Sequence, residues 1–176
     1  MRKFLCGFVL LFILAQAAPA LADVWPRWVR PRNRQVVVQF ERTRVSATMW
    51  AHAKAAMADW SRSGRVEAVP VAKCTNPYAY CVKVYEYSAR DGRAGHTELY
   101  ADPRTHRAWY GKVSLNLYYL RSWTQRRKTS CHEVGHAVGA VHRDGLTCMR
   151  QGMAQAWIHP SSADFAYLQR IYALPG

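Results

Sequence analysis

The stretch from Ser130 to Gly152, SCHEVGHAVGAVHRDGLTCMRQG, gathers side chains that bind metals in proteins. It contains three of the chain's seven histidines, two of its five cysteines, a glutamate and a methionine, with four glycines between them. His132 and His136 are four residues apart, a spacing that puts both on one face of an α-helix, one turn apart. Both imidazoles could then reach one ion. The sequence therefore predicts a helix that supplies two histidine ligands to a metal.

The residues after His136 predict how the chain brings a third ligand to the same ion. Gly139 stands where a helix ends in a left-handed conformation, which favours glycine. The chain can then turn back and deliver His142, although Asp144 is close enough in sequence to compete as the third ligand. Three imidazoles with one open coordination position are typical of catalytic zinc, whereas structural zinc sites have four protein ligands.

Glu133 lies next to His132 but is rotated away from the line of the two histidines. It cannot easily bind the same ion, yet it can reach a water molecule beside that ion. HEVGH matches the short HExxH pattern of the zincins, in which the glutamate is a general base. The alternative interpretation is a surface helix without a metal site, in which the histidines have this spacing by chance. The spacing of the third histidine argues against it.

HEVGHAVGAVH, residues 132–142, resembles the complete zinc motif of the metzincin endopeptidases, HExxHxxGxxH. The resemblance implies His132, His136 and His142 as zinc ligands and Glu133 as the general base. Since His142 has the motif's spacing, we prefer it to Asp144. Met149 stands where the family's Met-turn follows, and would form a hydrophobic floor beneath the metal.

The same resemblance implies a zinc endopeptidase similar to the small secreted bacterial metzincins, acting on extended polypeptides. The predicted strand Gly95–Tyr100 would be the antiparallel edge along the cleft, where a substrate could pair with it. The chain departs from the family at two places. Arg143 follows the third histidine and assigns no subfamily, and Gln151 stands where many relatives have a tyrosine.

The hydrophobic pattern outside the motif predicts an α+β fold. Strands are expected at Gln35–Phe40, Val66–Ala72, Cys81–Ser88, Gly95–Tyr100 and Lys112–Leu120. Helices are expected at Ser46–Ser61, at Thr124–Ala140 behind a capping box of Ser122 and Gln125, and from Ser161 onward. We expect a metzincin-like zincin domain: a five-stranded mixed sheet packed against two long helices, followed by a C-terminal helix.

The first 22 residues are predicted to be a signal peptide. Arg2 and Lys3 precede the apolar run Phe4–Ala18, and Ala20–Ala22 offers a cleavage site of small residues. The run is shorter than the roughly 20 residues that span a bilayer, so we favour cleavage over a membrane anchor. The mature protein, residues 23–176, is then a single secreted catalytic domain that does not span a membrane.

Four cysteines remain after cleavage, an even number that favours two disulfides in an exported protein. Three pairings are formally open. Cys74 and Cys81 lie close together and would staple a turn, which leaves Cys131 to pair with Cys148.

The chain is strongly basic. Without Arg2 and Lys3 it has 23 basic and 11 acidic residues, a net charge of +12. This charge favours acidic peptides or anionic surfaces as partners, although it also serves solubility alone. We expect a monomer with no specific nucleic-acid partner.

Two rival functions remain open from the sequence. One is a basic secreted protein that binds cell surfaces on a zincin fold without hydrolysis; Glu133 argues against it, because a pure binder has no need of a general base. The other is a zinc hydrolase that cleaves a non-peptide amide of the cell wall.

Overall fold

The computed structural model describes residues 26–29, 34–74, 80–152 and 157–173, and the structural statements below concern these residues. The elements in chain order are β1 (Arg27–Trp28), β2 (Val36–Arg44), α1 (Ala47–Ser61), β3 (Val66–Val71), β4 (Tyr80–Tyr87), β5 (Gly95–Ala101), β6 (Arg107–Asn116), α2 (Trp123–Ala137) and α3 (Ser162–Ile171). The predicted signal peptide, residues 1–22, lies outside the described residues.

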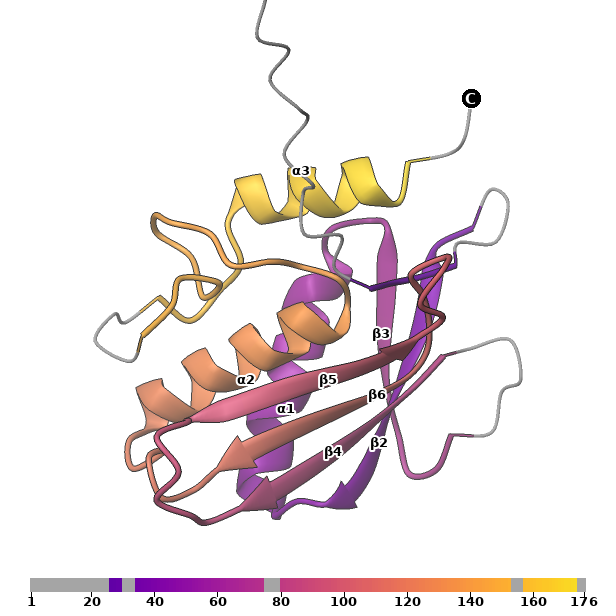
Figure 1. The fold of residues 1–176 in the computed structure, drawn as a ribbon. Coiled ribbons are helices and arrows are strands. Elements are labelled where there is room, and N and C mark those ends of the chain that lie inside the picture. Colours follow the sequence, from indigo (N-terminus) through magenta and orange to yellow (C-terminus); the bar gives the residue numbers. More distant parts are fainter. Residues whose placement is uncertain (1–25, 30–33, 75–79, 153–156, 174–176) are drawn as a thin grey trace, which may run out of the picture.

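A six-stranded mixed sheet forms the centre of the fold (Figure 1). Its order is β1-β6-β4-β2-β3, and β5 pairs with β6. β5 is antiparallel to β6, whereas every other pair of neighbouring strands is parallel. The mixed sheet and the antiparallel edge strand are therefore confirmed. The predicted count of five strands was one short, because the two-residue β1 is too brief to leave a hydrophobic pattern in the sequence.

The interior strand β2 illustrates why the sheet forms. Val36, Val38 and Phe40 are fully buried, as expected for a parallel strand covered on its inner face. β3 pairs only with β2 and lies at the edge of the sheet, where Pro70, which has no backbone N–H, is tolerated. β6 starts at Arg107, five residues earlier than predicted, because its first two residues pair with β1.

The helices α1 and α2 pack against each other on one face of the sheet (Figure 1). The predicted apolar face of α1 is buried, and it includes Trp60 at its last turn. The indole nitrogen of Trp60 donates a hydrogen bond to the carbonyl oxygen of Cys131, 2.8 Å away. A Cβ atom on Gly135 would lie 2.5 Å from the Trp60 ring. The close approach of the two helices therefore depends on a glycine inside the HEVGH motif.

The end of α2 is set by contacts with remote elements. The helix begins with the predicted capping box at Ser122 but stops at Ala137, three residues earlier than expected, because the chain turns at Gly139 (φ +99°). Trp28 of β1 donates its indole N–H to the Ala137 carbonyl at 2.7 Å. The Tyr172 hydroxyl, just after α3, donates to the Val138 carbonyl at 3.1 Å. These side chains satisfy carbonyl groups that a helix end leaves without partners.

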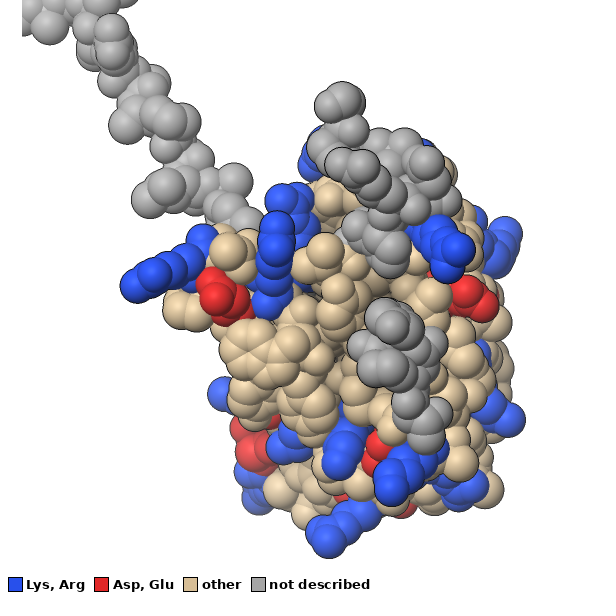
Figure 2. Space-filling view, turned by 90° about the vertical axis from the view of Figure 1, so that its right-hand side faces the viewer, with Lys and Arg blue, Asp and Glu red and all other residues tan. Residues whose placement is uncertain are grey.

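The face shown in Figure 2 carries an excess of basic residues. On this face, Lys and Arg side chains outnumber acidic ones and are separated by uncharged residues. Within the described residues, no helix is long and apolar enough to cross a membrane.

Candidate metal centre

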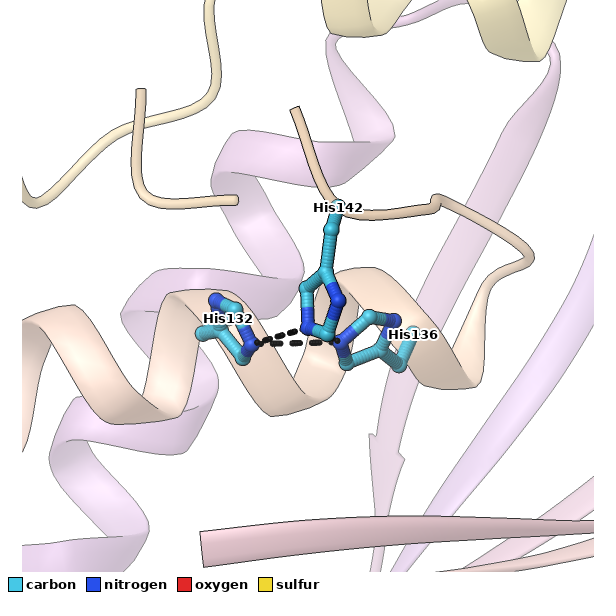
Figure 3. Close-up of side chains that lie close together, drawn as sticks. All are labelled: His132, His136 and His142. Carbon is cyan, nitrogen blue, oxygen red and sulfur yellow. Dashed lines mark hydrogen bonds between the residues drawn. The ribbon is translucent and has the colours of Figure 1, made fainter. Parts of the chain in front are cut away.

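Three imidazoles converge on one point beside α2 (Figure 3). His132 and His136 project from the helix, and His142 reaches down from the segment that follows it. The three Nε2 atoms are 3.1 Å apart between His132 and His136, 3.0 Å between His136 and His142, and 3.2 Å between His132 and His142. Two nitrogen ligands of a tetrahedral zinc ion are about 3.3 Å apart. The triangle therefore has the size that one zinc ion requires.

The Nδ1 atoms show which nitrogens carry the protons. His132 Nδ1 lies 2.8 Å from the Cys148 carbonyl oxygen, and His136 Nδ1 lies 2.9 Å from the Ala140 carbonyl oxygen. A carbonyl oxygen only accepts hydrogen bonds, so both protons must be on Nδ1. The two Nε2 atoms then face each other with lone pairs 3.1 Å apart, an arrangement that repels unless a cation lies between them. Such outer contacts also orient metal-binding histidines.

The third imidazole is oriented by a side chain instead of a carbonyl. The amide nitrogen of Gln151 lies 2.8 Å from His142 Nδ1. An amide can present either its nitrogen or its oxygen at such a place, so Gln151 can also accept a hydrogen bond from a protonated Nδ1. This contact was not predicted from the sequence, where Gln151 was noted only as standing in place of a tyrosine.

Burial keeps the three imidazoles uncharged. Desolvation lowers the pKa of His132 to about 4 and that of His136 to about 3, and it also lowers the pKa of His142. Near pH 7 the imidazoles are therefore in the neutral form that binds metals.

Glu133 lies on the inner side of α2, against β5. Burial raises its pKa to about 7. The hydroxyl of Thr97 lies 2.7 Å from Glu133 Oε2 and 2.9 Å from the Glu133 carbonyl oxygen. A Cβ atom on Gly95 would come within 2.9 Å of the Glu133 side chain, so a larger residue there would displace the carboxyl group. Neither Thr97 nor Gly95 was predicted as a site residue, because their role depends on how strand and helix meet.

The segment after α2 is fixed beneath the helix at two points. Cys131 and Cys148 form a disulfide with a Cα–Cα distance of 5.9 Å. Met149 is fully buried, and a Cβ on Gly135 would lie 2.5 Å from its sulfur atom. The other predicted disulfide, Cys74–Cys81, is also present. That bridge removes Glu41, Cys74 and Cys81 as a second group of metal ligands, because bridged sulfurs are not thiolates.

Asp144, the alternative third ligand, is exposed and does not belong to the histidine cluster. Its neighbour Arg143 turns toward α3 and places Nε 3.3 Å from Asp164 Oδ1. The residue after the third histidine thus links this segment to the C-terminal helix.

The site is open to solvent on both sides of Glu133. One cavity of about 570 Å³ is lined by the three histidines, Glu133 and part of β5. A smaller one, of about 220 Å³, lies toward the N-terminal half of α2 and also touches His132 and Glu133. A ligand in either cavity would contact the carboxyl group.

No protein-family model matches the sequence, and no curated protein is similar to it. Solved structures do resemble it. High choriolytic enzyme 1, a hatching-enzyme zinc protease of the medaka fish Oryzias latipes, has a TM-score of 0.56 at 14% identity, covering 87% of this chain and 97% of that one. Myroilysin has a TM-score of 0.54 at 12% identity, covering 86% and 97%, and a second myroilysin structure has 0.53 at 11%, covering 85% and 86%. With its histidine triad consistent with the HExxH…H motif, the chain has the α+β fold of the metzincin zinc proteases.

Proposed function

We propose that this protein is a secreted zinc-dependent endopeptidase in which His132, His136 and His142 hold the metal and Glu133 is the general base. The observation that carries the proposal is the pair of Nε2 lone pairs at 3.1 Å, with a third Nε2 within 3.2 Å of both. A cation resolves the repulsion between these nitrogens, and three neutral imidazoles are a donor set that zinc prefers. The fold shared with zinc proteases supports the same assignment.

The donor set favours a catalytic over a structural zinc. No fourth His, Cys, Asp or Glu joins the cluster within the described residues. When bound at such an open site, zinc lowers the pKa of water to about 7 and polarises a carbonyl oxygen.

Glu133 has the environment of a proton carrier. In the proposed reaction its carboxylate takes a proton from the attacking water and passes it to the nitrogen of the leaving amine. A pKa of about 7 suits both proton transfers near neutral pH, because the group can then accept the proton from water and also donate it to the amine. The Thr97 hydroxyl, 2.7 Å from Oε2, restrains the carboxylate during both steps.

An extended polypeptide is the substrate that the cleft favours. β5 pairs with β6 on one side, and its other edge runs beside α2 (Figure 1). Residues of β5 and the three histidines line the same cavity. A peptide can add to this edge through backbone hydrogen bonds, which bind any sequence in extended form. The scissile carbonyl would then lie between β5 and the three imidazoles.

The proposed location outside the cytoplasm has two supports. The structure contains two disulfides, which persist in oxidising compartments. The sequence pattern of residues 1–22 is that of a signal peptide.

Casein or gelatin zymography with and without a chelator tests the proposal. Clearing that disappears with chelator and returns with zinc is expected. Glu133→Gln should keep about one zinc per chain, because its imidazoles are intact. It should lower peptide hydrolysis by about a hundredfold to ten-thousandfold, because an amide cannot accept the proton.

The rival functions give different outcomes in the same assay. A surface-binding protein would clear neither substrate, whatever its zinc content. A hydrolase of cell-wall amides would leave casein intact and release fragments from cell-wall material. Full hydrolysis by the Glu133 variant would contradict the proposed mechanism.

A further inference from the structure

The smaller of the two cavities beside Glu133 has a distinct chemical character. It is lined by Gly92, Ala94, Gly95, Lys128, Thr129, His132, Glu133, Arg150 and Gly152, and is called the basic cavity below. Two of these residues are cations that come from different elements. Lys128 belongs to α2, one turn before His132, and Arg150 follows Met149.

The ammonium group of Lys128 is deeply placed. The residue is only 4% exposed, which is rare for lysine. Its Nζ donates a hydrogen bond to the Gly152 carbonyl oxygen. An ammonium group has three donors, so this bond leaves two that can meet a ligand in the cavity.

Neither cation has an acidic partner among the described residues. The ion pairs found there involve other side chains, and none includes Lys128 or Arg150. Asp91, next to the lining residue Gly92, is already engaged by Tyr87, Asn116 and the amide of Arg93.

Lys128 and Arg150 line the same cavity, and neither forms an ion pair with Glu133, the one carboxyl group in its lining. Burial lowers the pKa of Lys128, and the charge of Arg150 lowers it further. A buried charge is normally kept only where it is paired. The cost of an unpaired buried charge is removed when an anionic ligand enters, and such strained charges are common where proteins bind ligands.

We propose that the basic cavity binds the carboxylate side chain of an aspartate or glutamate that flanks the scissile bond of the substrate, with Lys128 and Arg150 as its cationic partners. The proposal rests on the proposed peptidase function and names the class of peptide that this site prefers. It assigns the specificity to two residues of this chain.

The size and position of the basic cavity fit one side chain. Its volume of about 220 Å³ is below the roughly 300–1,000 Å³ of pockets that hold whole small molecules. Glu133 and His132 form part of its wall, so a side chain inside it belongs to a residue next to the reacting bond. The Lys and Arg side chains visible on the face in Figure 2 are different in kind, because they lie at the surface, whereas Lys128 is buried.

The test measures kcat/KM on matched peptides that each contain one cleavable bond. Each of the two residues flanking that bond is varied in turn among Glu, Gln and Lys. At one of the two positions, kcat/KM for the Glu peptide should exceed that for the Gln peptide by about tenfold or more. The amide of Gln has the same shape as the carboxylate but lacks the negative charge that would pair with Lys128 and Arg150. Lys should be cleaved more slowly than Gln at the same position.

Variants assign the preference to the cavity. Lys128→Met keeps the apolar stem and removes the charge, and should bring the Glu/Gln ratio close to one. Arg150→Gln should lower the ratio in part, and Lys128→Arg should restore most of it. Lys54→Gln is the matched control: it removes one exposed charge on α1, far from the cavity lining, and should leave the ratio unchanged. Zinc content and melting temperature of each variant show whether it has folded.

A binding measurement separates this proposal from the peptidase function. In the Glu133→Gln background, fluorescence anisotropy should show the Glu peptide binding about tenfold more tightly than the Gln peptide, and Lys128→Met should remove the difference. If peptides are cleaved but the ratio is one at both positions, the cavity has no acidic preference and the proposal is wrong. If no peptide is cleaved, the peptidase function fails, and equal affinity for Glu and Gln peptides would then overturn the proposal as well.

Discussion

Two regions of the molecule hold the three histidines, and they do so by different means. His132 and His136 come from α2, whose backbone hydrogen bonds fix their spacing. His142 comes from the segment of residues 138–152, called the ligand segment below, which contains no helix or strand. Its position depends on a disulfide and a buried methionine, and Arg143 adds a contact with α3. The spacing of His132 and His136 is thus a local property of the helix. The position of His142 instead depends on contacts with other parts of the fold.

The largest expected effect comes from removing the ligand that the segment supplies. His142→Ala should lose zinc and hydrolysis together, because two imidazoles bind zinc much more weakly than three. Asp144→Ala, two residues away on an exposed part of the same segment, should keep both. Metal analysis and peptide kinetics on purified variants provide the measurement. If the Asp144 variant lost zinc and the His142 variant kept it, the third zinc ligand would be the Asp144 carboxylate.

The difference between the regions also decides what the sequence could predict. The positions of His132, His136 and Glu133 on α2 followed from helical periodicity, which acts over four residues. The turn that ends α2 followed from the position of Gly139. Local rules were sufficient for the helical spacing, but they placed the last residue of α2 at Ala140 instead of Ala137.

Contacts between distant residues were not predictable in this way. The side chains that complete the end of α2 come from Trp28 and Tyr172, each more than 30 residues from the carbonyl group that it contacts. The two-residue strand β1, which positions Trp28, has no periodicity to detect. Thr97 reaches Glu133 only because β5 packs on α2. Such contacts depend on the folded arrangement of whole elements.

The second largest effect should come from the disulfide that joins the two regions. Cys131→Ser combined with Cys148→Ser opens a loop with a sequence separation of 17, which corresponds to about 3 kcal/mol of unfolding free energy in the chain-entropy model. The matched change at Cys74 and Cys81, with a separation of 7, should cost about 2 kcal/mol. Urea denaturation measures both.

Zinc affinity distinguishes the two bridges more sharply than stability does. The carbonyl of Cys148 orients His132, so loss of the Cys131–Cys148 bridge should also weaken zinc binding. Among the described residues, the Cys74–Cys81 bridge is not part of the histidine cluster, and its loss should leave zinc affinity unchanged. Equal zinc affinity in the two double variants would contradict the view that the bridge positions the ligand segment.

A smaller effect is expected at Gln151, whose amide contacts His142. His136 is oriented by a backbone carbonyl, which a side-chain substitution cannot remove. His142 is oriented by the Gln151 side chain, so a substitution at Gln151 changes the orientation of this histidine without changing the helix. Gln151→Ala should weaken zinc binding about 10- to 100-fold, the usual effect of losing such a contact. Gln169→Ala, an exposed glutamine on α3, is the control. Competition with a chelator measures the affinity, and a fall in kcat at full zinc occupancy would instead place Gln151 on the substrate.

The smallest effect should come from Arg143, which links the ligand segment to α3. Its side chain is 34% exposed and its Nε atom lies 3.3 Å from Asp164 Oδ1 without an aligned hydrogen bond. The Asp164 carboxylate also accepts hydrogen bonds from the Thr147 hydroxyl and from the backbone N–H and hydroxyl of Ser161. It therefore keeps partners without Arg143, and Arg143→Gln should lower the unfolding free energy by only about 1 kcal/mol. Arg90→Gln, on an exposed loop, should have no measurable effect. Because the disulfide and Met149 already fix the segment, zinc affinity should be unchanged by Arg143→Gln. A loss of zinc affinity comparable to that of Gln151→Ala would mean that α3, and not the disulfide, sets the position of His142.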